Sequence, residues 1–86
     1  MPRISEFYGI VIAMFYNDHE PPHFHAIYSE HRALIGIDSV QVLQGALPRR
    51  ALNLVFEWAA MHRGELLENW RRAREHTSLQ HIEPLE

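Results

Sequence analysis

The first half of the chain alternates short apolar runs with turn-forming residues. Residues 8–16 are apolar almost throughout and β-branched in the middle, which predicts a buried strand. Residues 23–30 predict a second strand. Its two faces would carry His23, His25, Ile27 and Ser29 on one side and Phe24, Ala26, Tyr28 and Glu30 on the other. A tight turn then leads to a third strand over residues 32–37, and residues 40–43 add a short fourth one. The pattern therefore predicts an antiparallel meander of three or four strands.

The second half has helical spacing. From Pro48 to Glu75 the apolar residues recur every three or four positions, which predicts one helix of about 27 residues with a break near Gly64. Pro48 suits the first turn, where its missing N–H is not needed. The tail over residues 79–85 is expected to add an edge strand. The predicted fold is α+β, with the meander packed against one long α-helix and a C-terminal edge strand.

Length and composition narrow the class of protein. The 86 residues predict a single domain over 1–86, and the chain has no cysteine for a disulfide or a thiolate metal site. A net charge of −3 is not the signature of a protein that wraps along nucleic acid, although a local basic patch is compatible with it. The chain shows no signal-peptide pattern and no long apolar span, so we expect a cytoplasmic protein without a membrane segment.

Histidine is the unusual residue, and three of the seven lie in the stretch DHEPPHFH at residues 18–25. A structural interpretation explains part of this stretch, because Asp18 can bond nearby backbone amides and the two prolines fix a bend. It does not explain why His23 and His25 share one face of a strand. The stretch therefore points to a site.

A second set of polar residues lies among the apolar positions that form the buried face of the predicted helix. His62, Glu65 and Asn69 are three and four positions apart, so they form one stripe together with Trp58. Buried polar groups need partners, and we expect the histidines of strand 23–30 to face the helix and supply them. The alternatives are that His62 is a satisfied core residue, that Glu65 reaches solvent and that Asn69 bonds a loop carbonyl.

Two chemistries fit these histidines. His19, His23 and His25 are candidate ligands for a divalent metal such as zinc, with Asp18 or the helix as a further source of ligands. Alternatively, histidines can act as general acid and base on RNA without a metal. The catalytic candidates are then His23, His25 and His62.

In the acid–base alternative, Asp18 would orient one imidazole. Arg49 and Arg50, in the first turn of the helix, would hold phosphate. Glu65, Asn69 and Trp58 would support the site.

Three segments carry a family resemblance: FYGIVIAMFYNDHEPPHFHA, LPRRALNLVFEWAAMHRGELLENWRRA and IEPL. Together they resemble the bacterial family called domain of unknown function 4160, from Ile4 to Leu85. The resemblance implies a small cytoplasmic protein whose gene lies beside a second small gene, as in a toxin–antitoxin module, and it carries no established activity. It implies emphasis on positions that match the family pattern: Asp18, His19, Pro22, His23, His25, Trp58, His62, Asn69 and Trp70. Gly64 departs from that pattern, where a charged helix former is expected.

Two functions follow as hypotheses. The first is the toxin-like member of a two-gene module that acts on RNA, with a site formed by His19, His23, His25, His62 and Asn69. The second is a non-enzymatic module that binds a partner protein and whose histidine cluster is structural or holds a divalent metal. In both, the protein from the adjacent gene is the expected partner, and a homodimer through the tail or the first strand is an alternative.

Overall fold

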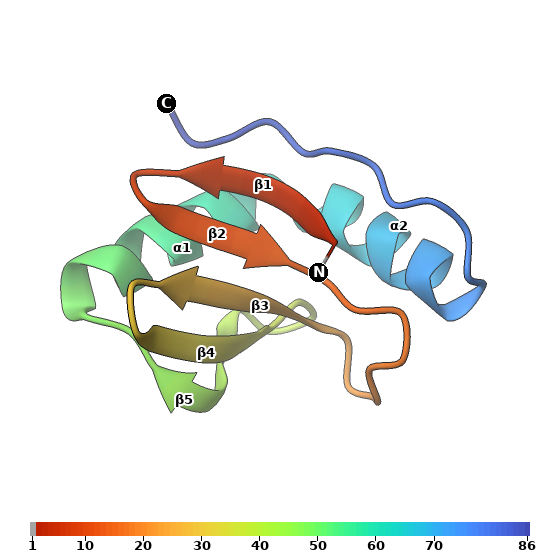
Figure 1. The fold of residues 1–86 in the computed structure, drawn as a ribbon, viewed down its shortest axis with the longest axis horizontal. Helices are drawn as coiled ribbons and strands as arrows, with labels where there is room; N and C mark the ends of the chain where they lie inside the picture. The colour runs from red at the N-terminus through yellow and green to blue at the C-terminus, as the bar shows by residue number, and fades with distance from the viewer. Residues whose placement is uncertain (1) are drawn as a thin grey trace.

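Five antiparallel strands form one sheet in the order of the sequence, and two helices cover one of its faces (Figure 1). The computed structural model describes residues 2–86. The elements are β1 (Arg3–Phe7), β2 (Ile10–Ala13), β3 (His23–Tyr28), β4 (His31–Gly36), β5 (Gln41–Ala46), α1 (Arg49–Met61) and α2 (Arg63–Arg74). The α+β class predicted from the sequence is confirmed, whereas the numbers of strands and helices differ.

The strand predicted over residues 8–16 is present as the shorter β2, and it is the second strand of a hairpin whose first strand, β1, was not predicted. Tyr8 and Gly9 form the turn, with φ angles of 51° and 78°. Two consecutive positive φ angles are typical of the turns that join hairpin strands, and glycine adopts them without steric cost. Phe7 pairs with Ile10 across this turn, and both are buried. Tyr8 is an aromatic residue although it is 59% exposed, so a hydrophobicity pattern does not reveal the turn.

The later strands agree with the prediction to within a few residues. β3 pairs with β4 from His23↔Gly36 to Tyr28↔His31. The connecting turn lies at Ser29–Glu30, one residue earlier than expected, and Ser29 has a φ of 55°. β5 runs from Gln41 to Ala46 and all six of its residues are exposed, so it is the open edge of the sheet.

The expected single long helix is two helices. His62 separates them with φ −121° and ψ 25°, two residues before the break expected near Gly64. α1 packs on the sheet through Trp58, which is fully buried and whose ring lies 5.8 Å from that of Phe24 and 5.3 Å from that of Phe7. An aromatic side chain of this size buries about 150–250 Å², which is worth about 4–6 kcal/mol at 25 cal/mol per Å². Trp58 therefore anchors α1 to β1 and β3.

The exposed side of α2 is lined with ion pairs. Arg71 and Arg72 both donate hydrogen bonds to the carboxylate of Glu68. The bond from Arg71 is the main reason that the pKa of Glu68 lies below its usual value. Such exposed pairs contribute little to stability.

The C-terminal tail crosses the molecule beside β1 without forming a regular strand (Figure 1, blue). One ladder-type bond joins the backbone N–H of Ile82 to the carbonyl of Ile4 at 2.8 Å. The Ile82 side chain is almost completely buried. The predicted edge strand is therefore an irregular segment, yet it covers the outer edge of β1. Among residues 2–86, no helix is both long and apolar enough to cross a membrane.

Candidate functional site

Three polar side chains meet at the start of β3, on the sheet face that points away from α1. His23 and His25 alternate with Phe24, which points toward α1 and contacts Trp58. Asp18 comes from the loop that connects β2 to β3 and returns over the two histidines. The apolar face of β3 therefore faces α1, so the expectation that His23 and His25 face the helix is wrong for α1, although the His23 ring contacts Trp70 of α2.

One carboxylate oxygen lies between the two imidazoles. Asp18 Oδ2 is 3.0 Å from His25 Nε2 and 3.3 Å from His23 Nε2. All three ligand-type atoms lie within 4.8 Å of one another. The side chains are 22%, 23% and 9% exposed for Asp18, His25 and His23 respectively. The cluster is therefore mostly shielded from solvent but reachable from one side.

The hydrogen bond on the far side of His23 fixes its tautomer. His23 Nδ1 lies 2.8 Å from the carbonyl oxygen of Pro21, which can only accept, so Nδ1 must carry a proton. In a neutral His23, Nε2 is then an unprotonated lone pair that faces the carboxylate of Asp18. Two acceptors this close repel each other unless a proton or a cation lies between them. The geometry thus suits a proton or a cation held between His23 and Asp18.

Aromatic rings hold the two imidazoles in place. The ring of Phe15, from the same loop as Asp18, meets the ring of His25 edge-on at 4.5 Å. The ring of Trp70, from α2, lies 5.2 Å from that of His23. Because these neighbours are apolar and large, both imidazoles are restricted to a narrow range of orientations.

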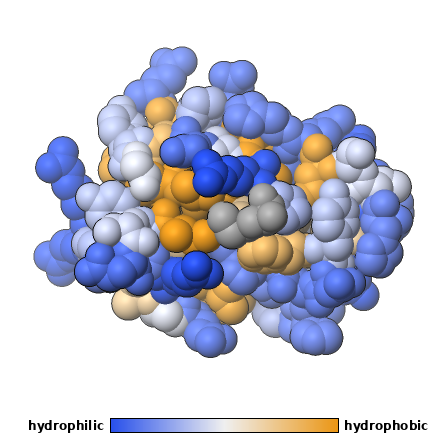
Figure 2. All heavy atoms as spheres, viewed as in Figure 1, coloured by the Kyte–Doolittle hydropathy of each residue, from blue (hydrophilic) through white to orange (hydrophobic). Residues whose placement is uncertain are grey.

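Two hollows border the cluster. One, of about 350 Å³, is lined by loop residues from Asp18 to Pro21, by His23 and by Leu34, Leu43 and Gln44. The other, of about 270 Å³, is lined by His25 and by β4 and β5 residues including Arg32 and Gln44. The face of the molecule turned away from α1 mixes strongly hydrophilic side chains with a central apolar area (Figure 2). The two hollows give a small ligand access to the cluster.

The helical stripe predicted to join the histidines lies elsewhere. His62 Nδ1 pairs with Glu65 Oε1 at 2.6 Å on the helix surface, and the His62 ring packs 5.5 Å from that of Trp58. Asn69 donates to the Gln80 carbonyl and accepts from the Gln80 N–H, both at 2.8 Å. The alternative that Asn69 bonds a loop carbonyl is the one observed. The helix and the tail supply these partners, so no partner from the sheet is needed.

The remaining predicted residues also lie outside the cluster. His19 is exposed and lines the larger hollow without joining the three converging side chains. Trp58 is a core residue whose Nε1 donates to the Glu83 carbonyl at 2.8 Å. Its role is to join α1 to the tail.

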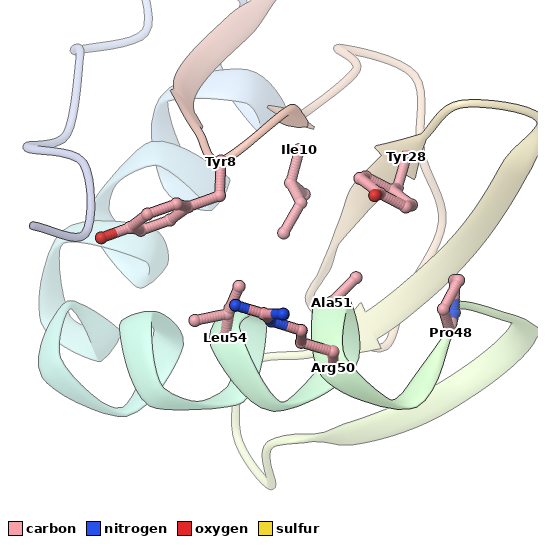
Figure 3. A pocket seen from close by; sticks show the side chains of 7 residues that line it. All are labelled: Tyr8, Ile10, Tyr28, Pro48, Arg50, Ala51 and Leu54. Carbon is pink, nitrogen blue, oxygen red and sulfur yellow. The ribbon is translucent and has the colours of Figure 1, made fainter.

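Arg49 and Arg50 lie far from the histidines. Arg50 borders a separate cavity of about 280 Å³ between α1 and the other end of β3, together with Tyr8 and Tyr28 (Figure 3). At 3.3 Å per residue, the five steps from His23 to Tyr28 span about 16 Å. Tyr28 also lies on the α1 side of the sheet. These arginines therefore do not reach a group bound at His23 and His25.

Sequence reasoning missed Arg32 and the Pro21 carbonyl. Arg32 is opposite Ile27 in the ladder, which puts it on the same sheet face as His25. The register of β3 and β4 is the signal that places it there, and a hydrophobicity pattern does not give that register. The Pro21 carbonyl depends on the path of the loop and has no sequence signature.

The composition of the cluster and the distances from Asp18 are compatible with a metal centre. Two ligands about 2.1 Å from one zinc ion and about 90–110° apart lie about 3.0–3.4 Å from each other. The two distances from Asp18 fall in this range. A backbone carbonyl that accepts from the outer imidazole nitrogen, as Pro21 does for His23, is the usual second contact of a metal-binding histidine. An acid–base pair would instead expose both Nε2 atoms to substrate rather than aim them at one carboxylate.

Comparison with known proteins gives one match. The family model described as "Domain of unknown function (DUF4160)" matches residues 9–71, which is most of the chain and includes the whole cluster. The comparisons with curated proteins and with solved structures gave no significant match.

Proposed function

Because the chain belongs to the DUF4160 family, whose description gives no activity, we propose its function from the site: it binds a divalent metal ion through Asp18, His23 and His25. The observation that carries this proposal is the tautomer of His23. Its Nδ1–H is committed to the Pro21 carbonyl, so a neutral imidazole turns its Nε2 lone pair toward a carboxylate oxygen 3.3 Å away. A cation between them turns this repulsion into two coordination bonds.

The ligand types favour a borderline first-row metal such as zinc. Imidazole nitrogen and carboxylate oxygen both bind zinc, whereas an all-oxygen set would favour magnesium or calcium. Three protein ligands leave at least one coordination position free, which is the arrangement of catalytic rather than structural zinc sites. The two hollows beside the cluster supply room for a ligand at that position.

The test is a zinc titration of protein made without a histidine tag, followed by calorimetry and elemental analysis. We expect one zinc ion per chain for the wild type and at least a tenfold weaker affinity for His25→Ala and for Asp18→Asn. His31→Ala is the matched control, because His31 is exposed and outside the cluster. His19→Ala should also keep the wild-type affinity.

Thermal unfolding separates a metal centre from a simple ion pair. A ligand at 100 times its Kd stabilises the folded state by about 2.7 kcal/mol. For a domain of this size that raises the Tm by about 11–22 °C. If the ion pair of a protonated His23 with Asp18 is the true state, zinc and chelators will leave the Tm unchanged, and the proposal is then wrong.

We further propose that the centre belongs to the toxin-like member of a two-gene module and acts on RNA. A bound metal with a free position supplies Lewis-acid chemistry suited to phosphodiesters, and the adjoining hollows supply access. The assay is expression with and without the neighbouring gene, with growth and RNA integrity as readouts. Equal growth and intact RNA in both cases, with His25→Ala behaving like the wild type, would leave only the metal-binding function.

Association with the partner protein or with a second copy remains a proposal. The tail contacts the outer edge of β1, so β5 is the sheet edge that stays exposed, and it carries the exposed apolar side chains Val42 and Leu43. Sedimentation at high concentration tests the homodimer, and a monomer there would exclude it.

A further inference from the structure

Arg32 lies next to the metal-binding cluster on the same face of the sheet. In the β3–β4 ladder His25 is opposite Leu34 and Ile27 is opposite Arg32, so Arg32 is the diagonal neighbour of His25. Diagonal neighbours on one face are about 7–8 Å apart, which is within the reach of an arginine side chain. The guanidinium group can therefore contact a small ligand bound at the cluster.

The hollow between His25 and Arg32 is lined by these two polar side chains and by the apolar residues Ala33 and Leu34. Its volume is about 270 Å³, and Gln44 and Gly45 of β5 complete it. Among the described residues that line it, none carries a carboxylate. A cavity with a guanidinium, an amide and an imidazole, and without negative charge, favours an anionic occupant.

The charge of Arg32 is not neutralised by a neighbour. Five of the eight arginines make hydrogen bonds within the molecule: Arg3, Arg63, Arg71, Arg72 and Arg74. Within residues 2–86, the Arg32 side chain makes no hydrogen bond or salt bridge, and the residue is exposed. Arg49 and Arg50 are also without such a partner in that part of the chain, but they lie on the α1 side of the sheet.

We propose that Arg32 binds the oxyanion of a ligand that is coordinated by the metal at Asp18, His23 and His25, and that this oxyanion is a phosphate group. The proposal rests on the metal-binding function. The planar fork of arginine donates two parallel hydrogen bonds to a phosphate or a carboxylate oxygen pair, and the metal takes a third oxygen. A tetrahedral phosphate presents enough oxygens to satisfy both, whereas a carboxylate has only two.

The experiment is a calorimetric titration of the zinc-loaded protein with methylphosphonate, and separately with acetate. We expect Arg32→Gln to weaken methylphosphonate binding at least tenfold and to leave zinc affinity unchanged. Arg32→Lys keeps the charge but loses the fork, so its affinity should be intermediate. Arg49→Gln is the matched control and should bind methylphosphonate like the wild type.

The outcomes separate this inference from the metal-binding proposal. If zinc binds but methylphosphonate binding is absent or equal in wild type and Arg32→Gln, Arg32 is not the anion-binding residue and the metal centre stands. If the wild type binds no zinc, both proposals are wrong. If acetate binds as tightly as methylphosphonate with the same dependence on Arg32, the anion-binding role is supported and the assignment to phosphate is overturned.

Discussion

Asn69 is the side chain that attaches the C-terminal tail to α2, and its removal gives a sharp test of the fold. It is 1% exposed and makes two hydrogen bonds of 2.8 Å with the backbone of one residue, Gln80. Asn69→Ala removes the donor and the acceptor together. Since the bonds involve the backbone of Gln80, its exposed side chain is not part of the contact.

The expected cost follows from these two bonds. A hydrogen bond to an uncharged partner contributes about 1 kcal/mol, and a buried group left without a partner costs about 1–3 kcal/mol. The tail can move to let water reach part of the Gln80 backbone, so we expect a loss of about 2–4 kcal/mol in the free energy of unfolding. For a domain of this size, each kcal/mol lowers the Tm by about 4–8 °C.

The assay is urea and thermal unfolding followed by circular dichroism. Gln80→Ala is the matched control and should stay within about 0.5 kcal/mol of the wild type. Asn69→Asp keeps the acceptor for the Gln80 N–H but places a negative oxygen against the Gln80 carbonyl, so it should also destabilise. Equal stabilities for Asn69→Ala and the wild type would refute the reasoning, as would a Gln80→Ala variant as unstable as Asn69→Ala.

Four further outcomes follow from the structure. A Cβ at Gly45, which has a φ of +82°, would lie 2.3 Å from the Arg32 carbonyl oxygen, so Gly45→Ala should lower the Tm. A Cβ at Gly64 meets nothing within 4 Å, so Gly64→Ala should raise stability by about 0.5–1 kcal/mol in the same unfolding assay. The Ser5 hydroxyl is buried without a hydrogen-bond partner among residues 2–86, so Ser5→Ala should stabilise by up to about 1 kcal/mol in urea unfolding, and a loss of stability would contradict an unpaired hydroxyl. Zinc affinity measured by calorimetry should fall as the pH is lowered below neutrality, because imidazole binds metal only when it is deprotonated. An affinity that does not change with pH would argue against histidine ligands.

Local patterns in the sequence determined the parts of the fold that depend on periodicity. The change from period two to period 3.6 at Pro48 gave the α+β class and the start of α1. The period of a strand placed His23 and His25 on one face, and the helical period put Asn69 on a buried face. These features follow from backbone geometry alone, so no distant contact was needed to infer them.

Tertiary structure decided which surfaces meet. β3 has two faces, and the packing of Phe24 against Trp58 turned the apolar one toward α1, which left His23 and His25 on the opposite face. The partner of Asn69 came from the tail, eleven residues away, because that segment covers the end of α2. Periodicity assigns a residue to a face of its own element. What covers that face depends on the loop paths and strand registers that bring Asp18 and Arg32 to His25, and these are set by the packing of the whole chain.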